Sequence, residues 1–509
     1  MNKKSIRCHL IYIIIILFSA VFFYSLLINI NTKNEIIKIF SGFIRSDFLV
    51  LSLFIVIVLF VSSLVKGMVG KLIRLFLIVA FFGFLLQGLW AKVDTENNVI
   101  AGLLPRSDSN SYFLDSMRIS LGIKASGFSS RANFPAFISL LMFITKQSMQ
   151  YTLAVNVFLA ALASYLSFEI ISERFGTLPG ILFFILTFFF YRPFSGKFLT
   201  ENIAYSLGLI GFCLMYIGFV RKDNKYFFIG LICITFALYI RPGPIFIIPA
   251  LIITFIKNKE CSRNEGIILF VHSCIIIIVC FFIEYLYSRL FMVKGIIPFS
   301  NYSYTLYGLS KGGTGWGSIR LDYPNFFNPE KISVEELSQS NTVKWIYSLA
   351  FQNIRNNPTN LIKGILKQYP LIFNISYKLG FFSFIFDKNK TLYYLSQYLL
   401  YLFSFFSIFY LLKRKDYIVN ILLFSFVIGM LLSIPLIPFS DQSQMRAYAG
   451  VIGFIALVPI PGFSFLLEKI NLSKENKNTY FTNQSYDVLI FSILLILLIC
   501  ILPLSLVII

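Results

Sequence analysis

The segment around Asp108 is the sharpest local feature of the chain that could carry out chemistry. Asp108 follows Pro105-Arg106-Ser107, and Tyr112 lies four residues further on, in an expected short helix over about 110–121. A carboxylate at a helix start that faces a cavity can act as a general base and take a proton from an attacking hydroxyl. The simpler interpretation is that Ser107 or Asp108 only caps the helix. Asp115 would lie on the same helical face, but seven residues is too far for a tightly coupled carboxyl pair of the glycosidase kind.

Further ionisable residues are expected near the same edge of the membrane. Charged side chains inside a membrane or at its edge are costly, so they mark candidate sites. Those in the outer connections or near outer helix ends, as assigned below, are Asp94, Glu96, Asp108, Asp115, Arg131, Arg192, Lys197, Glu201, Arg241, Glu284, Arg289 and Arg446. Each alone could be a solvated loop charge, but Glu201 opens an apolar helix and Arg241 closes one. We expect one outward-facing cavity to collect many of them.

The composition indicates that a membrane surrounds the elements that position these residues. Of the 509 residues, 57% are hydrophobic and 13% are charged, whereas soluble domains carry about 25% charged residues. The apolar residues occur in blocks of about 20 or more, the length that crosses a bilayer. This pattern excludes a water-soluble enzyme, a disordered chain, a fibrous repeat and a disulfide-stapled secreted domain. The predicted fold class is an all-α polytopic membrane protein.

Roughly thirteen helices are predicted to span the membrane. Their ranges are 9–31, 48–65, 72–91, 149–171, 178–192, 202–220, 226–240, 244–257, 266–290, 393–412, 417–438, 448–468 and 487–507. The first begins with basic residues, as a signal peptide does. Its apolar run is too long and no small-residue cleavage site follows, so we expect a retained helix.

The distribution of Lys and Arg orients these spans. With the N-terminus inside, the even-numbered connections should be cytoplasmic and basic. They contain Lys66, Lys71 and Arg74, then Arg174, then Arg221, Lys222 and Lys225, then Lys257, Lys259 and Arg263, then Lys413, Arg414 and Lys415, and finally Lys469, Lys474 and Lys477. Because every inner connection is basic, we attribute the net charge of +21 to orientation and anionic lipid rather than to nucleic-acid binding. The chain is expected in the cytoplasmic (inner) membrane.

Two long polar segments then lie on the extracytoplasmic side. The predicted regions are N-terminal spans (1–91), a first outer loop with the acidic segment (92–148), central spans (149–290), a second outer loop (291–392) and C-terminal spans (393–509). No cysteine lies in either loop, so disulfides are not expected. The chain has no Cys/His cluster typical of zinc, although carboxylates alone could hold a divalent cation. We therefore predict no metal ligands and no certain cofactor.

The order of several short motifs on one side of the membrane resembles the GT-C superfamily, membrane glycosyltransferases that use polyprenyl-phosphate-linked sugars, and in particular the protein-mannosyltransferase and aminoarabinose-transferase types. After Asp108 with Tyr112, the similar motifs are Arg131-Ala132-Asn133-Phe134-Pro135-Ala136-Phe137, Thr200-Glu201-Asn202, Tyr239-Ile240-Arg241-Pro242, Tyr307-Gly308, Gly312-Gly313-Thr314-Gly315-Trp316, Asn356-Asn357-Pro358, Pro438-Phe439-Ser440-Asp441 and Arg446-Ala447-Tyr448. The resemblance covers roughly residues 95–465. The chain departs from the family pattern in two ways. Three spans precede the acidic loop where the family commonly has one, and the chain ends in a span without a C-terminal outer domain.

The resemblance implies a glycosyltransferase that moves a sugar from a lipid phosphate, with inversion at the anomeric carbon. Asp108 would be the general base. The donor phosphate would be bound by Arg241, Arg446 and Arg131, whose guanidinium forks match phosphate oxygens without a metal. The substrate-binding residues would be Tyr112, Glu201, Tyr307 and Trp316. Interfacial anchoring explains Tyr307 and Trp316 equally well.

The expected partners are therefore a polyprenyl-phosphate-linked sugar donor, the lipid bilayer and an envelope acceptor, such as a lipid-linked glycan or a lipopolysaccharide. Two alternatives stay open. An envelope polysaccharide polymerase or ligase would transfer a whole glycan from a lipid diphosphate. A lipid-linked oligosaccharide flippase, or another transporter, would more often have repeated halves and charges near the midplane. The candidate charges gather at one membrane face, which favours an enzyme.

Overall fold

The structure is a computed structural model that describes residues 3–28, 35–90, 108–126, 131–295, 300–324, 340–376, 379–414, 417–441, 445–470 and 484–507. Apart from one isolated β-bridge between Ala125 and Met292, the regular structure of these residues is helical. The α-helices are α1 (Lys3–Ile28), α2 (Glu35–Ile44), α3 (Phe48–Ser63), α4 (Gly67–Trp90), α5 (Asp108–Ser120), α6 (Asn133–Ile144), α7 (Met149–Phe175), α8 (Thr177–Tyr191), α9 (Thr200–Arg221), α10 (Asn224–Ile240), α11 (Ile247–Lys259), α12 (Arg263–Phe291), α13 (Asn301–Ser310), α14 (Ser318–Asp322), α15 (Ser340–Asn356), α16 (Pro358–Leu366), α17 (Lys390–Arg414), α18 (Tyr417–Ser433), α19 (Ile452–Leu457), α20 (Ile460–Lys469) and α21 (Gln484–Ile496). Short 3₁₀ or π turns are η3 (Pro370–Phe373), η4 (Phe439–Asp441), η5 (Arg446–Val451), η6 (Leu497–Ile501) and η7 (Leu502–Val507).

Among these residues, seven helical stretches are long and apolar enough to cross a membrane. They are Gly67–Leu86, Met149–Phe175, Thr200–Arg221, Arg263–Phe291, Lys390–Lys413, Arg446–Lys469 and Val488–Leu506. Six shorter apolar helices accompany them, with 10–17 residues each. The predicted all-α membrane fold is confirmed at this level. The count of thirteen spans and the assignment of the loops between them stay predictions.

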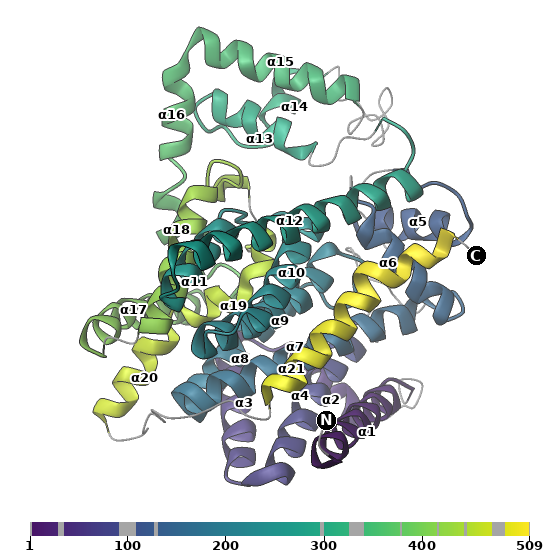
Figure 1. The fold of residues 1–509 in the computed structure, drawn as a ribbon, viewed down its shortest axis with the longest axis vertical. Coiled ribbons are helices and arrows are strands. Elements are labelled where there is room, and N and C mark those ends of the chain that lie inside the picture. The colour runs from purple at the N-terminus through teal and green to yellow at the C-terminus, as the bar shows by residue number, and fades with distance from the viewer. Residues whose placement is uncertain are drawn as a thin grey trace.

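The spans differ in what surrounds them, and this sets the architecture. In α9, 94% of the apolar window is buried against other helices, whereas in α12 only 17% is. A helix that is apolar on all sides is stable either inside a bundle or against lipid tails. Thus α9 forms the centre of the bundle, with α7 and α10 packed on it, while α12 presents most of its apolar surface outward (Figure 1).

The first predicted outer loop contains more packed structure than a surface loop. The expected helix over about 110–121 is present as α5, and α6 follows it. In α6 every residue from Asn133 to Met142 is buried, and the helix packs on α5. Pro135 lies in its first turn, where no helical hydrogen bond needs its missing N–H. The sequence of α6 is apolar on every face, which is why it enters the protein core.

Four helices of the second predicted outer segment form a layer at one end of the molecule, which we call the cap: the described residues of 300–369, with α13–α16 (Figure 1). The cap has a small apolar core of its own, built around Tyr304, Tyr307, Ile319 and Ile346. The predicted amphipathic piece near 360–373 is divided between α16 and η3. The cap thus lies over the helical body as a separately packed layer, and the candidate site lies between the two.

Candidate active site

A cavity of about 400 Å³ lies between the cap and the adjacent ends of the body helices. It is lined by Asp108, Arg131, Arg241, Pro242, Asn301, Tyr302, Thr305, Trp316, Leu436, Ile437, Asp441, Arg446 and Ala447. Its size falls in the range of about 300–1,000 Å³ that is usual for small-molecule sites. Five of the residues expected to form a site from the sequence therefore share one cavity, although they come from segments far apart in the chain.

A buried carboxylate holds two of the arginines together at the base of this cavity. Glu201, in the first turn of α9, is fully buried, and its Oε1 accepts a hydrogen bond of 2.7 Å from Arg446 Nε. Arg241 Nη2 lies 3.5 Å from the same oxygen. The other carboxylate oxygen accepts a hydrogen bond from Thr200. A single buried carboxylate thus fixes two guanidiniums beside each other at the cavity, and guanidinium groups match anionic oxygens.

Asp108 lies beside this pair, on the same wall of the cavity. Its Oδ2 is 3.7 Å from Arg446 Nη2, and 47% of its side chain is exposed. Arg446 therefore connects the exposed carboxylate of Asp108 to the buried one of Glu201. The exposed carboxylate is accessible from the cavity, as a general base must be.

Arg131 lies in the connection before α6 and supplies the third guanidinium. Its Nη1 donates a hydrogen bond of 3.1 Å to the carbonyl oxygen of Ile240, the residue before Arg241. The backbone N–H of Ala132 in turn donates to Glu284 Oε1 of α12 at 3.0 Å. Burial lowers the pKa of Arg131 from its usual value. Arg131 therefore both lines the cavity and ties the start of α6 to the end of α10, from which Arg241 emerges.

Two glycines allow the backbones that carry these arginines to approach each other. A Cβ atom on Gly208 of α9 would lie 2.5 Å from the carbonyl oxygen of Gly450, and one on Gly243 would lie 2.5 Å from that of Ala447. Real Cβ atoms do not make contacts this short, so only glycine fits at either position. The first contact sets η5, and hence Arg446, over the start of α9. The second places the loop after Arg241 against the residue that follows Arg446.

The cap provides the opposite wall of the cavity. Asp441 Oδ1 accepts a hydrogen bond of 2.8 Å from the backbone N–H of Trp316, and its Oδ2 lies 3.4 Å from the Thr305 hydroxyl. The indole ring of Trp316 stacks on Tyr304, with ring centroids 5.0 Å apart, and the guanidinium of Arg320 lies 4.7 Å from the Trp316 ring centre. Burial raises the pKa of Asp441, and the hydrogen bonds from Trp316, Ser440 and Thr305 oppose this rise. The loop before η5 and the cap therefore meet at Asp441.

Three of the residues expected to bind substrate do not line the cavity. Glu201 lies beneath the arginines, as described. Tyr112 is buried with its ring edge-on to Phe134, at 5.3 Å between centroids. Tyr307 belongs to the cap core, where its hydroxyl donates to Asp322 at 2.6 Å. These residues could act on a ligand only through the groups that they support.

Several charges of the wider outer set also lie elsewhere. Arg192 donates to the carbonyl oxygen of Ser46, and Asp115 accepts two hydrogen bonds from Ser126. Asp94 and Glu96 lie outside the described residues. The convergence predicted for the whole set holds for Asp108, Arg131, Arg241 and Arg446.

Asp441 and the α13 side chains are the functional candidates that sequence reasoning did not select. Asp441 occurs in a motif noted for its resemblance, but nothing in its local sequence places it opposite Arg241. Asn301 and Thr305 are four residues apart on one face of α13. That spacing is the only sequence signal for them, and it is common among ordinary polar residues.

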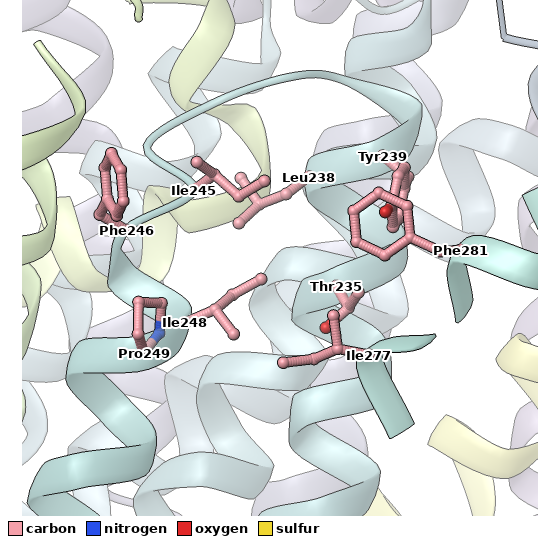
Figure 2. Close-up of a pocket in the computed structure, with 9 residues that line it drawn as sticks. All are labelled: Thr235, Leu238, Tyr239, Ile245, Phe246, Ile248, Pro249, Ile277 and Phe281. Atoms are coloured by element: carbon pink, nitrogen blue, oxygen red, sulfur yellow. The ribbon is translucent and has the colours of Figure 1, made fainter. Parts of the chain in front are cut away.

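A second, apolar pocket of about 240 Å³ adjoins the loop that carries Arg241. Figure 2 shows its lining side chains, which come from α10, from the start of α11 with the turn before it, and from α12. Tyr239 precedes Arg241 by two residues, and Ile245 follows it by four. Phe246 and Phe281 at the rim are 39% and 44% exposed, so the pocket opens to the surface of the bundle. One short connection, between α10 and α11, thus contributes residues to both the polar cavity and the apolar pocket.

The described part of the chain holds no group of three or more His, Cys, Asp or Glu side chains that could bind a metal ion. What it does hold, three guanidiniums beside an accessible carboxylate, can bind an anionic leaving group and accept a proton. No protein-family model, curated protein or solved structure matches this chain.

Proposed function

We propose that this protein is an integral-membrane glycosyltransferase that moves a sugar from a polyprenyl-phosphate donor to an envelope acceptor, on the extracytoplasmic face and with inversion. The observation that carries the proposal is the convergence of Asp108, Arg241 and Arg446 on one cavity at the end of the bundle that carries the cap. Arg131 adds a third guanidinium to the same cavity, so donors that match phosphate oxygens approach it from three segments of the chain.

The proposed chemistry assigns one role to each group. The Asp108 carboxylate takes the proton of an acceptor hydroxyl as the hydroxyl oxygen attacks the anomeric carbon of the donor. The bond between that carbon and the phosphate oxygen breaks, and the electron pair stays on the phosphate. Arg241 and Arg446 stabilise the charge that develops there, because Glu201 holds both in place before the reaction begins. Attack from the side opposite the phosphate inverts the anomeric carbon.

The neighbouring apolar pocket supports a lipid-linked donor rather than a soluble one. Arg241 and Pro242, which line the polar cavity, are close in sequence to Tyr239, Ile245 and Phe246, which line the apolar pocket (Figure 2). A long isoprenoid stays in the bilayer, so its phosphate arrives at the membrane edge, beside the ends of helices such as α10. The exposed apolar surface of α12 borders the same pocket and is suited to contact lipid tails.

The test is turnover by the purified full-length protein in lipid nanodiscs, with a panel of polyprenyl-phosphate sugars and release of polyprenyl phosphate as the readout. Asp108→Asn should lower the transfer rate about 10²–10⁴-fold, the usual contribution of a general base. The matched control is Asp322→Asn, the same change in the cap outside the cavity, which should keep the parent rate. Parent-like turnover by Asp108→Asn would remove the proposed base.

A substitution of Arg241 tests the proposed phosphate site. Arg241→Lys keeps the charge but loses the planar fork, so it should raise the donor KM about tenfold. An unchanged donor KM would remove Arg241 from the phosphate site.

A second donor, a lipid-diphosphate-linked oligosaccharide, distinguishes the transferase from the alternative functions. Release of lipid diphosphate alone would indicate a polymerase or ligase. In sealed proteoliposomes, movement of labelled lipid across the bilayer without release would indicate a transporter.

A further inference from the structure

The two walls of the cavity differ in charge, and the difference bears on the acceptor. The body wall carries Arg131, Arg241 and Arg446 with the carboxylate of Asp108. The opposite wall consists of Asn301, Tyr302, Thr305 and Trp316 of the cap with Asp441. Among the described residues that line the cavity on this cap wall, Asp441 is the only charged one.

We propose that the cap wall is the acceptor subsite and that it binds a neutral, polyhydroxylated group, that is, a ring of a glycan, with Asp441 accepting hydrogen bonds from its hydroxyls. The inference rests on the proposed function, since it takes the arginine wall to be occupied by the donor phosphate. It specifies the acceptor class and assigns a binding role to Asp441.

The charges on both walls select against an ionic acceptor group. An anion on the cap wall would meet the carboxylate of Asp441 and would be drawn instead to the guanidiniums opposite. A cation beside Asp441 would be attracted by that carboxylate and would face the guanidiniums of Arg131, Arg241 and Arg446 across a cavity of about 400 Å³, where Asp108 and Glu201 offset part of the repulsion. Like charges brought close together in a site of low dielectric cost more than they do in water. A neutral group with several O–H donors avoids both penalties.

The hydrogen-bonding capacity of the cap wall matches hydroxyl groups. A carboxylate has about four acceptor positions. Asp441 uses one for the Trp316 N–H at 2.8 Å, while its contacts with the Thr305 and Ser440 hydroxyls are long, at 3.4 Å each. Asn301, exposed at the start of α13, adds both a donor and an acceptor, and Tyr302 beside it adds a phenol. Several polar groups side by side suit a ring with several hydroxyls better than the single hydroxyl of a Ser or Thr side chain.

Trp316 has a different part in this subsite. Tyr304 and Arg320 both lie against its ring, so the indole is held in place as part of the wall. Its backbone N–H fixes Asp441 Oδ1. Trp316 therefore positions Asp441, and the specificity-determining contact belongs to the carboxylate.

The experiment measures binding by saturation-transfer NMR to the full-length protein in nanodiscs that contain polyprenyl phosphate, which carries no sugar and occupies the arginine wall. The probes are methyl glycosides of glucose, galactose and mannose, the methyl glycosides of glucuronic acid and glucosamine as anionic and cationic counterparts, and N-acetylserine amide as a single-hydroxyl probe. At least one neutral glycoside should bind the parent, and more tightly than the three other probes do.

Asp441→Asn should weaken that binding about tenfold or more, because a hydrogen bond to a charged acceptor becomes a neutral one. The amide oxygen can still accept the Trp316 N–H, so the cap stays attached. Asn301→Ala changes an exposed side chain and should weaken binding about threefold. Asp322→Asn is the matched control and should leave binding unchanged.

Three results would overturn the inference: no neutral glycoside binds the parent, the anionic or cationic glycoside or the single-hydroxyl probe binds best, or Asp441→Asn binds the neutral glycoside as the parent does. These outcomes are separate from failure of the proposed function, which is scored by release of polyprenyl phosphate from the donor. If the parent protein consumes donor but its binding of glycosides does not depend on Asp441, only the acceptor assignment is wrong. If it binds glycosides through Asp441 but never consumes donor, only the assignment as a transferase is wrong.

Discussion

The body wall and the cap wall of the cavity are built in opposite ways. Residues of the body wall emerge from the buried centre of the bundle, where Glu201 pairs with Arg241 and Arg446 and the backbones touch at glycines. Residues of the cap wall lie on short helices that have only a small core of their own. Polar contacts join the cap to the body, among them those of Asp441 with Trp316 and of Gln368 with Ser440.

The difference shows how one cavity can both stabilise a charged transition state and recognise hydroxyl groups. Charge that develops in a transition state is stabilised best by groups that are already oriented, and a tightly packed bundle provides them. Recognition of hydroxyl groups needs many weaker contacts, which a polar layer docked from outside can supply. Substitutions in the body wall should therefore lower stability and activity more than substitutions in the cap wall do.

The largest effect is expected at Glu201. Glu201→Ala removes the buried carboxylate that pairs with Arg241 and leaves Arg446 with its longer contact to Asp108, so the variant should lose on the order of 3–5 kcal/mol of stability. Thermal unfolding in detergent measures the loss. The cap counterpart is the half-exposed pair of Lys311 and Asp322, and Asp322→Asn should cost at most about 1 kcal/mol. Equal losses for the two variants would contradict the contrast between the walls.

Glycine substitutions provide the next comparison. Gly208→Ala places a Cβ against the Gly450 carbonyl, so it should cost about 1–3 kcal/mol and also lower transfer activity by displacing Arg446. In the cap, a Cβ on Gly317 would meet nothing within 4 Å, and Gly317→Ala should change stability by less than about 0.5 kcal/mol. Both variants are measured by thermal unfolding and donor turnover. A neutral Gly208→Ala would show that the close approach does not set the body wall.

A smaller effect is expected where the cap is attached. Gln368 is buried, and its Oε1 accepts a hydrogen bond of 3.0 Å from the Ser440 N–H. Gln368→Ala should weaken this attachment by about 1 kcal/mol. Hydrogen exchange should report it as faster exchange at Ser440 and Trp316, with little change at amides in α9. Uniform acceleration across the bundle would mean that cap and body unfold as one unit.

The smallest effect concerns pH. Hydrogen bonds from Lys311 and Tyr307 lower the pKa of Asp322 below its usual value. A carboxyl group whose pKa is lowered by folding adds stability above its unfolded pKa of about 4, and this stability is lost as the pH falls through the folded value. The difference in stability between the parent and Asp322→Asn should therefore shrink toward zero in acid. Unfolding midpoints between about pH 7 and pH 3 test this, and a difference that grows in acid would contradict it.

The residues of the body wall were largely predictable from the sequence. Arg241 and Glu201 stand where a charge meets an apolar helix, and such charges are costly unless they are paired. Asp108 was also predictable, because it stands at the start of an expected helix, which the structure contains as α5. The residues of the cap wall were not predictable, since Asn301 and Thr305 look like any exposed helix positions. The expectation that Tyr307 contacts substrate did not anticipate that its hydroxyl is engaged by Asp322.

The sequence by itself determined that this is an all-α membrane protein, because hydropathy is a sum over neighbouring residues and needs no knowledge of distant ones. Tertiary structure decided which charges meet. Glu201 and Arg446 are separated by 245 positions in the chain, and the close contact of Gly208 with Gly450 brings their helices together. Likewise, only the docking of the cap brings Asn301, Thr305 and Trp316 to the cavity that Asp441 and the arginines line. Pairing of charges depends on distances of a few ångströms between packed backbones, and no local property of the chain encodes such distances.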